Sequence, residues 1–184
     1  MKKFKVTIEG IAPILQSRHP NPTETAVIMK KDTGSRKKVK DLTDKEQFDM
    51  HAYRSKAGKF YQPSAQIEAA LVKAAVSFQL KGQKTYKDLF RAGVLVDETE
   101  IEHKNQKFTP FGEYATNKTA GAVWVVRPRC DKWELSFNLN VILDEQIPEE
   151  VLKEVLEYSG IATGIGAWRP KFGRFIVKEF KQVK

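Results

Sequence analysis

Residues 160–175 read Gly-Ile-Ala-Thr-Gly-Ile-Gly-Ala-Trp-Arg-Pro-Lys-Phe-Gly-Arg-Phe, a glycine-rich stretch that also carries basic and aromatic side chains. Glycine lets a backbone approach a ligand closely and adopt positive φ without a Cβ clash. The main-chain NH groups of such a loop can face a phosphate, while cations and flat rings suit a single-stranded nucleic acid. The same composition also fits a flexible connector between a helix and a strand. The place of this loop in the fold therefore matters for its interpretation.

Hydrophobic periodicity predicts the elements that surround the loop. An alternating strand begins at Phe4 and ends near Pro13, and a helix with one apolar face follows Ser64, which we interpret as its N-cap. We predict a polar loop at 104–120. The other predicted elements are a short helix, three strands, a second helix and a last strand, at 86–90, 94–101, 122–126, 133–143, 148–160 and 174–183.

This order is that of the ferredoxin-like fold, which the RRM also uses. We therefore predict one α+β domain over residues 1–184, with a ferredoxin-like (RRM-like) βαββαβ antiparallel sheet and the glycine-rich loop directly before the last strand. Strands 122–126 and 133–143 are predicted to form a hairpin. Residues 16–60 lack a sustained period, and we predict that they form one long insertion after the first strand.

Alternation also assigns three aromatic residues to the core. They are Trp124, Trp133 and Phe137.

The net charge of +9 over 184 residues favours an anionic partner, of which nucleic acid is the commonest. Cys130 is the single cysteine, so neither an intrachain disulfide nor a cysteine metal site can form, which fits a reducing compartment. No stretch approaches the roughly 18 apolar residues that a membrane span needs. We expect a cytoplasmic protein with no membrane contact, no cofactor and no metal.

A cluster of positive charge lies within the predicted insertion. Between Lys30 and Lys40 the chain carries six cations and a single acid, Asp32. One interpretation is a solvated surface loop. The other is an arm that binds phosphates with salt-sensitive affinity.

The glycine-rich loop resembles that of the RAMP superfamily of CRISPR-associated RNA-binding proteins. Members have Gly-apolar-Gly, a spacer with a basic residue, and another glycine between the second helix and the last strand. Here these are residues 164–166 and Gly173. Residues 60–71 are similar to the phrase that opens the first helix in backbone-type RAMPs. The chain departs from that phrase at Ala65, a serine in the family, and at Glu68, a lysine there, which indicates a diverged relative.

The resemblance implies a backbone subunit that binds single-stranded guide RNA in antiviral defence. It also implies assembly with further copies of itself along the RNA, and contacts with other CRISPR effector subunits. From the residues and the resemblance together, we expect nucleic-acid contacts in the loop, at the helix start and in the basic cluster. The expected residues are Gly164, Gly166, Trp168, Arg169, Lys171, Gly173, Arg174, Ser64, Lys30, Lys31, Arg36, Lys37 and Lys38.

Candidates for catalysis are few. Processing RAMPs cut RNA without metal by means of a histidine or a similar base, which makes His19 and His51 candidates, since a pKa near neutrality suits proton transfer. Target-cleaving backbone RAMPs use an aspartate after the first strand, and Asp32 is the best placed here. Its other interpretation is a turn-forming aspartate. No histidine pair has a metal-binding spacing.

We therefore expect a binding protein rather than an enzyme. Two alternatives stay open. One is a metal-independent RNA-processing endoribonuclease. The other is a non-CRISPR or viral protein that binds single-stranded nucleic acid.

Overall fold

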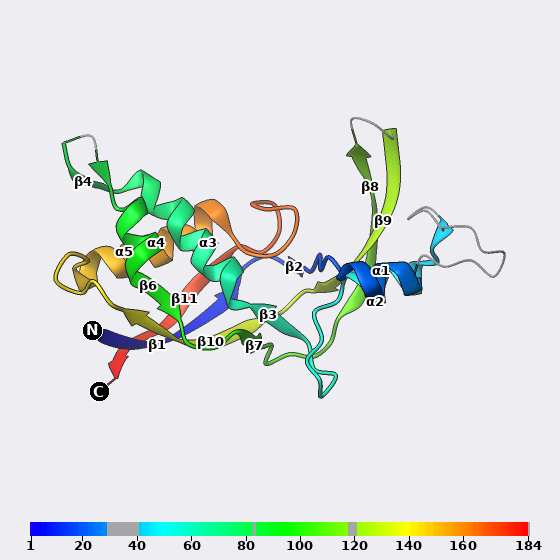
Figure 1. Ribbon diagram of the computed structural model, residues 1–184, viewed down its shortest axis with the longest axis horizontal. Coiled ribbons are helices and arrows are strands. Elements are labelled where there is room, and N and C mark those ends of the chain that lie inside the picture. The colour runs from blue at the N-terminus through cyan, green and yellow to red at the C-terminus, as the bar shows by residue number, and fades with distance from the viewer. Residues whose placement is uncertain (29–40, 83, 118–120, 184) are drawn as a thin grey trace.

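The computed structural model describes residues 1–28, 41–82, 84–117 and 121–183, and these form a mixed α+β fold with antiparallel sheets (Figure 1). The predicted α+β class is confirmed. The described elements are β1 (Lys2–Gly10), β2 (Ile14–Leu15), α1 (Pro22–Ile28), α2 (Asp44–His51), β3 (Tyr61–Pro63), α3 (Ser64–Ala74), β4 (Gln79–Lys81), β5 (Lys84–Thr85), α4 (Lys87–Gly93), β6 (Val94–Val96), β7 (Glu100–Glu102), β8 (Thr109–Asn117), β9 (Gly121–Cys130), β10 (Glu134–Val141), α5 (Glu149–Tyr158) and β11 (Phe175–Val183).

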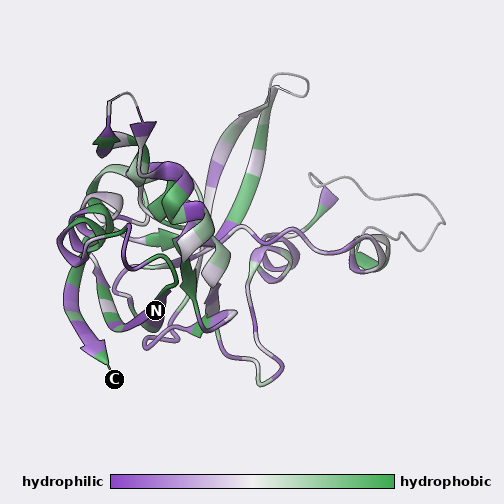
Figure 2. Cartoon of the chain, turned by 60° about the vertical axis from the view of Figure 1, so that its left-hand side comes forward, coloured by the Kyte–Doolittle hydropathy of each residue, from purple (hydrophilic) through white to green (hydrophobic). Residues whose placement is uncertain are grey.

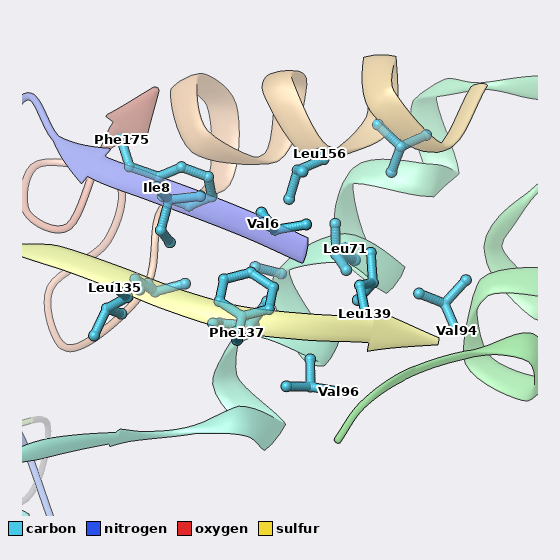
Figure 3. Packing of buried hydrophobic residues seen from close by; sticks show 14 of the residues in the cluster. Val6, Ile8, Leu71, Val94, Val96, Leu135, Phe137, Leu139, Leu156 and Phe175 are labelled. Carbon is cyan, nitrogen blue, oxygen red and sulfur yellow. The ribbon is translucent and has the colours of Figure 1, made fainter. Parts of the chain in front are cut away.

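A four-stranded antiparallel sheet forms the centre of the molecule, in the order β11-β1-β10-β6. Side chains alternate across it, as strands require. In β1, Val6 and Ile8 are buried, and in β10 so are Leu135, Phe137 and Leu139. Figure 3 shows these side chains gathered with Leu71 of α3 and Leu156 of α5, so both helices pack on the same face of the sheet.

Helix α3 forms because apolar residues recur at helical spacing, with Ile67, Leu71 and Ala74 buried against the sheet. It begins at Ser64 itself, and Pro63 occupies the N-cap position without a side-chain hydrogen bond. The prediction of Ser64 as the N-cap was therefore wrong by one residue. Proline fits this boundary because its fixed φ suits extended backbone.

Helix α5 likewise buries an apolar stripe through Leu152, Val155 and Leu156. It does not end at Gly160 as predicted. The chain continues in a π-helical turn over Ser159–Thr163 and leaves it at Gly164, whose φ is +67°. The first residues of the glycine-rich stretch, up to Thr163, are therefore helical.

A second sheet, in the order β2-β9-β8, corrects two predictions. Residues 104–120 were predicted as a polar loop, yet β8 lies within them and pairs with β9 along its whole length. Strand β9 does not form a hairpin with β10, which pairs with β1 and β6 instead. The β8–β9 hairpin projects from the body formed by the helices and the central sheet (Figures 1 and 2).

The predicted insertion 16–60 contains α1 and α2. Helix α2 starts with a capping box, in which the Thr43 hydroxyl accepts from the Glu46 NH at 3.2 Å and the Glu46 carboxylate accepts from the Thr43 NH at 2.8 Å. The side-chain oxygen of Gln47 accepts from the NH of Val126 at 2.9 Å. Helix α2 is thereby fixed to the hairpin.

Trp124 corrects another prediction. Trp133 and Phe137 are buried as expected, whereas Trp124 is 39% exposed on the hairpin, where its indole NH donates to Asp44 Oδ1 at 3.1 Å. Among the helices of the described residues, none combines the length and the apolar character of a membrane-spanning segment.

Candidate nucleic-acid interface

The glycine-rich loop lies against the short strand β2 (Figure 1, orange beside blue). The NH of Ala167 donates to the carbonyl of Leu15 at 2.8 Å, and the NH of Gly173 donates to that of Pro13 at 2.8 Å. The two arms of the loop also meet, because the NH of Ile165 donates to the carbonyl of Gly173 at 2.9 Å. The loop is thus a fixed structure and not a loose connector.

Its glycines allow this tight packing. Gly164, Gly166 and Gly173 have φ of +67°, +84° and +74°, where other residues are strained. A Cβ on Gly173 would lie 1.7 Å from the Ile165 carbonyl oxygen, and one on Gly166 would lie 2.5 Å from that of Leu15. Their NH groups donate within the protein, that of Gly164 to the Ser159 carbonyl at 2.8 Å. In this structure the three glycines therefore shape the loop and do not offer their NH groups to a phosphate.

The side chain of Gln66, on α3, contacts the loop. Gln66 Oε1 accepts from the NH of Gly166 at 3.0 Å, and Gln66 Nε2 donates to the Tyr53 hydroxyl at 3.4 Å. The glycine-rich loop, the start of α3 and the end of the insertion meet at this one residue. Ser64, expected as a contact residue, is two residues earlier and half-buried, with its NH donating to the Thr99 carbonyl at 3.1 Å.

The outer side of the loop presents positive charge to solvent. Arg169, Lys171 and Arg174 are all exposed. Lys171 Nζ lies 3.8 Å from a carboxylate oxygen of Glu113 on β8, a loose surface contact. Within the described part of the chain, the main-chain NH groups of Arg169 and Lys171 donate no hydrogen bond to another main-chain group. The structure thus brings three of the expected cations together on a fixed support.

Trp168 packs between the loop and the β8–β9 hairpin. Its ring centroid lies 6.2 Å from those of both Phe111 and Phe172. The Arg127 guanidinium carbon lies 4.3 Å from the Trp168 centroid, within the range of a cation–π contact. Arg129, two residues along β9, lies in the same way 5.0 Å from Phe111.

Sequence reasoning missed these two arginines. The only local signal was their spacing, because Arg127 and Arg129 point to the same side of a strand. Together with Trp168, Phe111 and Phe172, they form a cationic and aromatic junction between the hairpin and the loop.

Of the catalytic candidates in the described residues, His51 lies near the junction residue Arg127 and near His19. His51 is only 7% exposed, and its Nδ1 lies 3.2 Å from the Arg18 carbonyl. Burial lowers the pKa of His51, with a smaller contribution from the nearby charge of Arg127. His19 is exposed. Asp32 and the basic cluster of Lys30, Lys31, Arg36, Lys37 and Lys38 lie outside the described residues.

The described residues contain no group of three or more histidine, cysteine, aspartate and glutamate side chains that could hold a metal ion.

The sheet face opposite the helices has a different chemistry. Strand register places mostly polar and charged side chains there, together with the apolar Ile176, Val183 and Leu95, and none of the described residues on this face is aromatic. Lys178 is neutralised on this face, since its Nζ binds carboxylate oxygens of Glu134 at 2.8 Å and Glu9 at 3.4 Å. The pKa of Glu134 is lowered by hydrogen bonds from Lys104 and Lys178. This face lacks the stacking platform of an RRM sheet.

A comparison with protein-family models finds no match, and neither does a comparison with curated proteins. Among solved structures, the chain is similar to one described as the type III-B Cmr-beta bound to cognate target RNA. The TM-score is 0.55 at 15% identity, over 100% of this chain and 61% of that one. The chain thus spans about three fifths of the length of that neighbour. A CRISPR protein from Archaeoglobus fulgidus aligns at 16% identity over 100% of this chain and 65% of its own, with a TM-score of 0.38. At 15% identity the first likeness concerns the fold alone. The TM-score of 0.38 is too low for the second to support a conclusion.

Proposed function

We propose that this chain is a diverged RAMP-like subunit that binds single-stranded RNA through the glycine-rich loop and the adjoining hairpin. The observation that carries the proposal is the fixed presentation of Arg169, Lys171 and Arg174 beside the aromatic junction. Exposed cations next to aromatic rings are what a sequence-tolerant single-strand site requires. A net charge of +9 adds long-range attraction for a polyanion.

We also propose that the domain is ferredoxin-like and that its natural context is a CRISPR effector. The sheet order β11-β1-β10-β6, with α3 and α5 on one face, supports the first part. The fold likeness to a protein of a Cmr complex supports the second. On this proposal the RNA is a guide RNA, and further copies of the chain assemble along it.

Two alternatives are less well supported. An RRM-type single-strand binder would stack bases on the open sheet face, and none of the described residues there is aromatic. A metal-independent ribonuclease would use His51 or His19. The ring of His51 is buried, with Nδ1 3.2 Å from the Arg18 carbonyl and Nε2 without a partner among the described residues, so an RNA 2′-OH would not reach it in this structure.

The test measures binding of the full chain to a single-stranded oligoribonucleotide and to single-stranded DNA of the same sequence. Fluorescence anisotropy at several salt concentrations gives the affinities. We expect tighter binding to RNA, because contacts to the 2′-OH distinguish the two. We also expect affinity that falls as salt rises. Equal affinity for the RNA and the DNA would favour a protein that binds any single-stranded nucleic acid. No binding to RNA would refute the proposal.

A further inference from the structure

We propose that Arg127 forms a specific binding site, called here the phosphate seat, for one phosphate group of the bound RNA. It lies at the junction of β9 and the glycine-rich loop. This inference rests on the proposed function and deepens it, because Arg127 is internal to the hairpin and carries no resemblance to a known motif.

The geometry of Arg127 is that of an oriented cation. Its guanidinium lies over the Trp168 ring at 4.3 Å from the centroid. Trp168 is itself held with φ of +53°, an uncommon conformation for a residue other than glycine, between Phe111 and Phe172. Stacking fixes the plane of the guanidinium, so that its NH groups point along defined directions.

Those NH groups have no protein acceptor. Arg127 Nε and Nη1 are both buried, and neither makes a hydrogen bond to any described residue. Arg127 also belongs to none of the ion pairs found among the described residues, unlike Arg129, whose Nε lies 2.6 Å from Asp131. Burial lowers the pKa of Arg127, although an arginine remains charged.

A half-buried cation with two unsatisfied donors is costly for the free protein. Buried polar groups nearly always have partners, so an exception calls for an explanation. A guanidinium fork binds the paired oxygens of a phosphate or a carboxylate. The partner that we infer for Arg127 is an oxyanion supplied from outside the described residues, and its binding requires a small opening of the junction, because Nε and Nη1 are buried.

The surroundings favour a phosphodiester over a carboxylate from a second copy of the chain. Around this junction lie Arg129, Lys171 and the exposed Arg169, while Glu113 is the one acid that contacts the loop cations among the described residues. Phosphates repeat along a strand and so can meet several such cations at once. A single carboxylate would pair with Arg127 alone and leave the exposed Arg169 beside it without a partner.

The test compares Arg127→Gln with Arg91→Gln, which removes the same charge from an exposed arginine on α4 that pairs with Asp88. Anisotropy with a single-stranded oligoribonucleotide measures affinity, and thermal unfolding measures stability. We expect Arg127→Gln to weaken RNA binding about 10- to 100-fold. It should also reduce the log–log salt slope by about one. Its unfolding temperature should stay equal or rise, because an unpaired buried charge is removed. Arg91→Gln should resemble the wild type.

Arg127→Lys is the second variant, in case the glutamine chain does not fold. It keeps the charge and loses the fork, and we expect intermediate RNA affinity. If the wild type binds RNA and both Arg127 variants bind it equally well, the seat is refuted while the proposed function stands. If the wild type binds no RNA, the proposed function itself fails, and the phosphate seat with it. If the variants lose self-association in sedimentation while RNA binding is unchanged, the partner is a carboxylate of a second copy and the proposal is overturned.

Discussion

The side-chain oxygen of Gln66 accepts a hydrogen bond from the main-chain NH of Gly166 at 3.0 Å. The two residues are 100 positions apart and belong to the two stretches that resemble RAMP proteins, the start of the first helix and the glycine-rich loop. The contact gives a physical reason for both stretches to occur in one chain. The helix start positions the loop.

We predict that Gln66→Ala destabilises the protein and weakens RNA binding together. The NH of Gly166 would lose its acceptor in a partly buried place, at a cost of about 1–3 kcal/mol in the free energy of unfolding. Urea denaturation measures this change, and Gln79→Ala, on the exposed strand β4, is the control. Stability equal to that of the control would contradict the anchoring role of Gln66.

Gly173→Ala should be much more harmful than Gly58→Ala. Both glycines have positive φ, +74° and +77°, so both substitutions carry a backbone cost of about 1–2 kcal/mol. Only the alanine at 173 would also place a Cβ 1.7 Å from the Ile165 carbonyl oxygen, whereas that at 58 meets open space. Unfolding free energies of the two variants check this. Equal losses would mean that the loop can relax around an added methyl group.

Acid should destabilise the protein partly through His103. Burial lowers the pKa of this histidine from 6.5 to about 4, and its Nε2 lies 3.4 Å from Gln62 Oε1. Because the unfolded state takes up the proton first, stability is complete above pH 6.5 and falls as the pH drops toward 4. The full loss attributable to His103 is about 3 kcal/mol.

His103→Gln should flatten that part of the pH profile, whereas His19→Gln, at an exposed position, should leave it unchanged. Denaturation at several pH values between 4 and 7 gives the comparison. A His103→Gln profile as steep as that of the wild type would show that other groups cause the acid sensitivity.

We predict no site-specific cleavage by the protein alone. Excess protein is incubated with repeat RNA and with guide-complementary RNA, with a chelator or with divalent metal, and the products are resolved on a gel. Cutting in chelator that disappears in His19→Ala or His51→Ala would instead identify a processing enzyme. Metal-dependent cutting that disappears in Asp32→Ala would identify a target-cleaving subunit.

The central sheet could be predicted because its signal is local. Alternation in β1 and β10 is regular, and the apolar stripes of α3 and α5 have helical spacing. The β8–β9 hairpin could not. Pro110 and Gly112 resemble loop residues, and the choice of β8 as the partner of β9 depends on register across the whole molecule. The same choice explains the exposure of Trp124, which lies beside α2 and not in the core.

Part of the candidate site could also be predicted from the sequence, and part could not. Arg169, Lys171 and Arg174 are close together in the sequence, so any fold of the loop keeps them near one another. Gln66 and Arg127 meet the loop only through tertiary contacts, so their contact with it could not be predicted from the sequence around them. The glycines were predicted to contact nucleic acid, which stays a prediction, and the structure adds that their NH groups donate hydrogen bonds within the protein.

The most direct test of the RNA interface is the double variant Arg169→Ala with Lys171→Ala, measured beside Arg91→Ala with Lys153→Ala. Each pair removes one exposed arginine and one exposed lysine, so the net charge is equal in both. If the glycine-rich loop binds RNA, the first pair should weaken binding to a single-stranded oligoribonucleotide and lower the salt slope by about one for each phosphate that is no longer bound. The second pair should stay close to the wild type. Equal affinity and slope for the two folded variants would contradict RNA binding by the loop and leave it as a connector.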